Sequence, residues 1–169
     1  MTLFRSDSPN FAANVAALGL DPAQAVLQRP TITNTIGDVV TMGNNSSFGG
    51  FVIDGTLLTG NGVTNNGVNG ASVSDVQISN VGGAGILVQD VAANSSTTIV
   101  NTIIENAAGP AFHVNRGAGD IGFNSTSTTL DPSFASIVNS SNEAVLIEDR
   151  LGGNVNMFGA TIDDVGAGG

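Results

Sequence analysis

The sequence contains no cysteine, tryptophan, tyrosine or lysine, and it contains a single histidine. The lack of cysteine excludes disulfide bonds and thiolate metal sites, and one histidine cannot form a cluster of histidine ligands. The four basic residues are arginines scattered along 169 residues, against 14 acidic residues, so the formal net charge is −10. Because phosphate binding depends on clustered lysine and arginine, we expect no nucleic-acid partner.

Long apolar runs are missing as well. No run approaches the roughly 18 residues that a membrane-spanning helix needs, so we expect no membrane insertion. The first residues show no secretory signal, which is consistent with a signal already removed or with a piece of a longer chain. Aromatic residues make up only 5% and charged residues 11%, yet 41% are hydrophobic. This composition predicts a folded chain with an aliphatic core and a surface of Asn, Ser, Thr and Gly.

Residues 1–30 differ in sequence pattern from the rest of the chain. Ser8 and Pro9 are typical of a helix start, apolar residues follow at helical spacing, and Gly19 is a natural stop. A second short helix is predicted over 23–28, and Pro30 would end it. We therefore expect an N-terminal helical segment or cap over 1–30 and a different structure over 31–169.

Short apolar runs recur along residues 31–169 at a nearly constant spacing. Their central residues are 25, 26, 33 and 25 positions apart and form the series Ile53, Ile78, Ile104, Ile137 and Ile162. A second series contains Val40, Val63, Ile86, Phe112 and Val145. The residue two positions after each member is apolar, except after Val63, where it is Asn65. A third, weaker series contains Val73, Ile99, Ile121 with Phe123, and Val155 with Met157. The long gap contains polar residues 125–132, which we expect to form an outward loop.

Three short strands in each unit of about 25 residues predict a solenoid, because such strands cannot bury an apolar face without neighbouring units. The fold class we expect is all-β, a parallel β-helix of about five three-strand coils. Equivalent residues would then stack about 4.8 Å apart in columns. β-branched and small residues fill such a narrow interior well, which explains the shortage of aromatic residues.

A column of turn residues follows the first series of strands. Its members are of only three types, and they are Gly55, Asn80, Asn106, Asn139 and Asp164. These three types tolerate a positive φ best, so the sequence predicts a structural turn ladder rather than a ligand site. Stacked asparagine side chains could also form hydrogen bonds along this column.

Three segments, "GDVVTMGNNSSFGGFVIDG" at 37–55, "VSDVQISNVGGAGILV" at 73–88 and "TIIENAAGPAFHV" at 102–114, carry a resemblance to a known fold. They resemble the right-handed parallel β-helix, or pectate-lyase-like, superfamily over residues 31–169, most of all its repetitive bacterial surface and secreted proteins. The resemblance implies a right-handed coil. It implies no single function, because the superfamily includes polysaccharide lyases and hydrolases, phage tailspikes and adhesins.

Catalytic candidates are few. For a lyase, the resemblance would imply clustered Asp with an Arg or Lys base, and Arg116 with Asp90 and Asp149 on neighbouring coils is the one such group. The alternative for this trio is a surface ion pair on stacked turns. For a hydrolase, Asp163 and Asp164 are the only adjacent aspartates, and a glycosidase needs a second carboxylate placed across the substrate. We expect no metal site and no cofactor, although Ca²⁺ at one turn stays an open alternative.

His113 lies between two inward residues and should point outward. Its neighbours in the same column are Leu87 and Leu146, an unusual outward stripe for a solenoid. We expect the N-terminal helices, a loop or a partner to cover this face.

Taken together, these patterns favour a structural or adhesive module without catalytic activity, in a bacterial secreted or cell-surface protein. The partners we expect are further β-helix coils, or copies of the chain itself, stacked at an open C-terminal end. The alternative is an enzyme acting on polysaccharide, or a carbohydrate-binding remnant of one.

Overall fold

The computed structural model describes residues 29–33, 36–55, 60–126 and 135–163. The chain divides into two units, Met1–Pro30 and Thr31–Gly169, and nearly all described residues belong to the second. The two helices predicted before Pro30 and most of the predicted loop at 125–132 lie outside the described residues.

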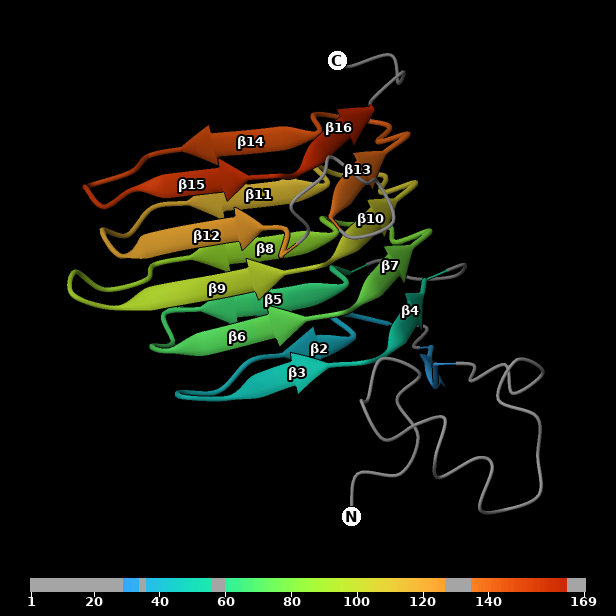
Figure 1. The fold of residues 1–169 in the computed structure, drawn as a ribbon, viewed down its shortest axis with the longest axis horizontal. Coiled ribbons are helices and arrows are strands. Elements are labelled where there is room, and N and C mark those ends of the chain that lie inside the picture. The colour runs from blue at the N-terminus through green and yellow to red at the C-terminus, as the bar shows by residue number, and fades with distance from the viewer. Residues whose placement is uncertain (1–28, 34–35, 56–59, 127–134, 164–169) are drawn as a thin grey trace. The chain divides into compact units, whose positions relative to one another are not determined.

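The described residues form short β-strands that belong to three parallel sheets (Figure 1). In order along the stack, sheet A contains β1 (Thr31–Ile32), β4 (Val52–Asp54), β7 (Gln77–Ser79), β10 (Ile103–Glu105), β13 (Ser136–Val138) and β16 (Thr161–Asp163). Sheet B contains β2 (Val40–Thr41), β5 (Val63–Asn66), β8 (Ile86–Gln89), β11 (Phe112–Asn115) and β14 (Val145–Glu148). Sheet C contains β3 (Ser47–Gly49), β6 (Ala71–Ser74), β9 (Ser96–Val100), β12 (Asp120–Asn124) and β15 (Val155–Phe158).

Each strand pairs with the strand three places along the chain, so consecutive strands always belong to different sheets. After β1, the strands form successive sets of three, and we call each set a coil. β2 to β4 form the first coil, and β14 to β16 form the last coil. The prediction of an all-β parallel solenoid with three strands in each coil is confirmed.

The strand register places the predicted series in columns. Ile32 precedes the first series, whose members pair directly in sheet A as Ile53, Ile78, Ile104, Ile137 and Ile162. The second series pairs in sheet B as Val40, Val63, Ile86, Phe112 and Val145. In sheet C the third series also pairs in register, and the pairing separates the two residues given for one coil. Phe123, rather than Ile121, continues the column that contains Phe48, Val73 and Ile99 and ends at Met157.

The interior is aliphatic, with two phenylalanines near its centre. Side chains from all three sheets are completely buried there, including Ile53, Ile78, Ile104 and Ile137. Phe112 of sheet B meets Phe123 of sheet C with ring centroids 5.2 Å apart. Because inward and outward residues alternate along each strand, these short strands together produce one continuous core.

A hydrogen-bonded polar pair lies inside this core. Asn65 takes an inward position beside Val88 in sheet B and is only 1% exposed. Its Nδ2 donates to Oγ1 of the buried Thr97 at 2.6 Å, and its Oδ1 accepts from the Val68 amide at 3.1 Å. The break in the sequence pattern therefore corresponds to a hydrogen-bonded polar pair that joins sheets B and C.

Candidate functional site

Residues with positive φ gather at the turns that follow each sheet. The column after sheet B contains Gly67, Asp90, Arg116 and Asp149. The column after sheet C contains Gly50, Asp75, Asn101 and Gly159. After sheet A the column contains Asn80, Asn106 and Asn139. Each coil thus turns through left-handed residues, which explains why Asn, Asp and Gly recur once per coil.

The predicted turn ladder lies on the corner after sheet A. Asn80, Asn106 and Asn139 have φ values of 55°, 54° and 51°. Asn106 Nδ2 donates to Asn80 Oδ1 at 3.4 Å, and Asn80 Nδ2 donates to Asp54 Oδ1 at 3.2 Å. Gly55 donates its amide to the Ser79 carbonyl at 2.8 Å. These side-chain contacts support a structural role for Asn80 and Asn106, and Asn139 shares their positive φ. Asp164 lies outside the described residues.

Arg116 and the two acids proposed with it lie in the turn column after sheet B. Arg116 Nη2 is 2.7 Å from Asp90 Oδ2, and the two side chains are 52% and 41% exposed. Among the described residues, no ion pair joins Arg116 to Asp149, one coil later. Exposed pairs of this kind contribute at most about 1 kcal/mol. The geometry is that of an ion pair on stacked turns.

The neighbouring Arg150 makes more contacts than Arg116 does. Its Nη1 donates to the Arg116 carbonyl at 2.6 Å, and its Nη2 donates to the Gly119 and Gly152 carbonyls. Arg150 therefore bridges two coils through backbone oxygens. Sequence reasoning missed this role, because the acceptors are carbonyl groups whose position depends on how the coils stack.

A substitution tests whether Arg116 is an exposed turn residue that contributes little to stability. Arg116→Gly removes the ion pair but suits the φ of 55° at this position. We expect the free energy of unfolding to change by less than about 1 kcal/mol, measured by urea denaturation. A loss above about 2 kcal/mol would contradict this account of the corner, because an exposed ion pair does not contribute that much.

His113 lies where the sequence predicted, on the outer side of sheet B. It pairs in register with Leu87 of β8 and Leu146 of β14, and both leucines are half-buried. His113 Nε2 is 2.9 Å from Glu148 Oε1, and the two side chains are 17% and 43% exposed. The structure thus brings Leu87, His113 and Leu146 into one outward column with an acidic residue beside it.

No group of three or more His, Asp or Glu side chains in the described residues is arranged to hold a metal ion. No helix in the same residues is long and apolar enough to cross a membrane.

The last coil exposes residues whose equivalents are buried in the other coils. Ile147 is 47% exposed, whereas Val114, its partner in β11, is completely buried. Ile162 is 50% exposed, whereas Ile137, its partner in β13, is completely buried. These two side chains belong to inward columns, so their exposure marks one end of the core.

The backbone amides of one column in sheet B form hydrogen bonds from each coil to the next. The amides of Val40, Val63, Ile86 and Phe112 donate to carbonyls of the following coil at 3.1, 3.0, 2.9 and 3.0 Å. Val145 is the next member of this column. Its amide is therefore placed to donate to a further coil beyond β14.

Comparisons of the chain with protein-family models, curated proteins and solved structures found no match.

Proposed function

We propose that the chain is a structural solenoid module whose last coil receives another parallel coil. The half-exposed Ile147 and Ile162, in columns that are otherwise buried, carry this proposal. An added coil would cover both side chains and supply acceptors to the row of amides that ends at Val145. Stacking of this kind is the repeating interaction that stabilises every other coil.

The occupant we infer is a further coil of the same solenoid type, belonging to a longer chain. Inward Val, Ile or Phe side chains in that coil would extend the existing columns. A second copy of the chain is the less favourable occupant, because each copy carries a formal net charge of −10 and two copies repel one another. We expect this repulsion to weaken as salt is added.

The setting we propose is a bacterial secreted or cell-surface protein of the pectate-lyase-like superfamily, with a spacer or adhesive role. A cysteine-free chain with few charges and many Asn, Ser, Thr and Gly residues supports this setting. Saturable cleavage of an acidic polysaccharide by the purified chain would contradict the proposed structural role. It would favour the alternative of an enzyme.

A two-strand graft, which extends sheets B and C over Ile147 and Val145, tests the proposal. A copy of residues 106–126, which contains β11 and β12, would be joined after Asp163 in place of residues 164–169. We expect the thermal midpoint to rise by at least about 4 °C, which corresponds to about 1–2 kcal/mol for a chain of this size. Circular dichroism measures the midpoint.

The matched control is the same graft with aspartate at three inward positions of the copy, equivalent to Phe112, Val114 and Phe123. This control has the same length but cannot extend the columns, so its midpoint should not exceed that of the original chain. Equal midpoints for the two grafts would overturn the proposal.

A further inference from the structure

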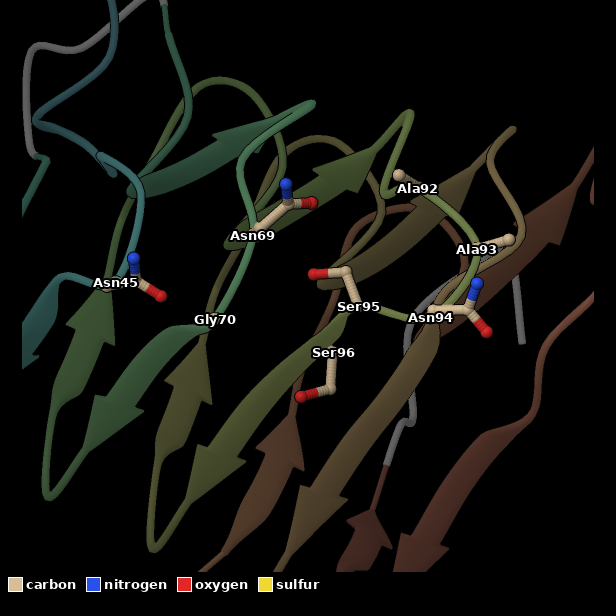
Figure 2. Close-up of a pocket in the computed structure, with 8 residues that line it drawn as sticks. All are labelled: Asn45, Asn69, Gly70, Ala92, Ala93, Asn94, Ser95 and Ser96. Atoms are coloured by element: carbon tan, nitrogen blue, oxygen red, sulfur yellow. The ribbon is translucent and has the colours of Figure 1, made fainter.

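A polar groove crosses the turns that connect sheet B to sheet C. It has a volume of about 320 Å³ and is formed by three successive turns (Figure 2). The residues that line it are Asn45, Asn69, Gly70, Ala92, Ala93, Asn94, Ser95 and Ser96. This volume lies at the lower end of the range of about 300–1,000 Å³ that is typical of small-molecule sites.

The backbone around the groove is held by hydrogen bonds between coils. The Asn45 amide donates to the Asn69 carbonyl at 2.7 Å, and the Gly70 amide donates to the Ser96 carbonyl at 3.1 Å. Asn44 Oδ1 accepts from the Asn69 amide at 2.8 Å. The three turns therefore form a fixed frame, so binding would not require the backbone to become ordered.

The side chains in this frame have unused hydrogen-bonding capacity. Within the described residues, no hydrogen bond involves the side-chain amides of Asn45, Asn69 or Asn94, and Ser95 Oγ is buried without a partner. Gly70 leaves room for the side chain of Asn45, because a Cβ at Gly70 would lie 2.6 Å from Asn45 Oδ1. Each of these side-chain amides can offer a ligand two N–H donors and one oxygen acceptor.

The lining also selects the charge of the ligand. It contains amides, hydroxyls and the methyl groups of Ala92 and Ala93, but no ionisable side chain. An anion would find no countercharge here and would meet a chain of net charge −10, and a metal cation would find no carboxylate. A ligand rich in hydroxyl groups, with apolar C–H faces and no charge, matches this lining.

We propose that the groove binds a neutral saccharide of one or two rings. The ring hydroxyls exchange hydrogen bonds with Asn69 and Asn94, and a C–H face lies against the alanine methyl groups. This site is separate from the last coil, so it stands whether or not that coil receives another. Without an aromatic platform, we expect weak binding, with a dissociation constant of about 1–10 mM.

Titration of the full chain by two-dimensional NMR tests the site. The probes are the neutral disaccharides cellobiose, maltose, lactose and N,N′-diacetylchitobiose, each at saturating millimolar concentration. Cellobiouronic acid is the charged counterpart of cellobiose. We expect at least one neutral probe to shift the backbone amides of residues 69–71 and 92–96, and the acidic probe to leave them unchanged.

Two variants and a control make the test specific. Asn94→Gly removes one amide while keeping a residue that suits the φ of 64°, and Asn69→Ala removes another. Each should weaken binding at least about fivefold, a loss typical of one hydrogen bond. Asn139→Gly, at a left-handed turn after sheet A, should bind as the original chain does.

Three results would overturn the proposal: no shift with any neutral probe, shifts spread evenly over the surface, or equal binding by the Asn94→Gly and Asn139→Gly variants. Because the original chain and all variants are compared by their spectra, a variant that fails to fold is recognised directly. The remaining variant at Asn69 or Asn94 then decides the outcome.

Discussion

Replacing Phe112 with alanine is expected to lower the free energy of unfolding by about 3–5 kcal/mol. Phe112 is completely buried and packs on Phe123 at the meeting point of sheets B and C. Its removal leaves a cavity between coils that the stacked strands cannot close, because their spacing is fixed by backbone hydrogen bonds. Urea denaturation followed by circular dichroism measures the effect.

Phe158→Ala is the matched control for this prediction. Phe158 is 69% exposed at the end of β15, so its truncation should cost less than about 1 kcal/mol. Similar losses for the two variants would show that Phe112 is not at the centre of a continuous core, and they would contradict the stacking described above.

Thr97→Val is expected to cost about 1–3 kcal/mol, although it conserves volume. The substitution leaves the Asn65 amide without its acceptor in a site where both residues are at most 2% exposed. A buried polar group without a partner costs more than the bond itself contributes. The free energy of unfolding in urea measures this cost.

A double-mutant cycle gives the decisive comparison for this pair. In a chain that already carries Asn65→Val, the Thr97→Val substitution should cost much less, because the Asn65 side-chain amide that needs an acceptor is then absent. Equal costs of Thr97→Val in the two backgrounds would show that the two side chains do not depend on one another.

The architecture followed from the sequence because the repeat is regular. Ile53, Ile78 and Ile104 stack as their spacing predicts, since a parallel coil places equivalent residues in register. Alternation identified the inward residues in the same way, and Asn80 and Asn106 marked a turn that needs positive φ.

Other features depend on contacts between coils that spacing does not show. Ile121 and Phe123 both alternate correctly, and only the pairing with β9 determines that Phe123 continues the column of Ile99. Asn65 looked like a break because its partner Thr97 lies one coil away in a different sheet. The groove was missed for the same reason, because its residues come from three turns that the sequence separates.

Amide hydrogen exchange at Val145 tests the central claim, that the last coil is built to receive another. The Phe112 amide, which already bonds to the Ala144 carbonyl at 3.0 Å, provides the protected reference within the same column. In the original chain we expect the Val145 amide to exchange far faster than that of Phe112. In the grafted chain it should approach the protection of Phe112, whereas in the aspartate control it should stay fast. Exchange at Val145 that is unchanged by the graft would contradict the account.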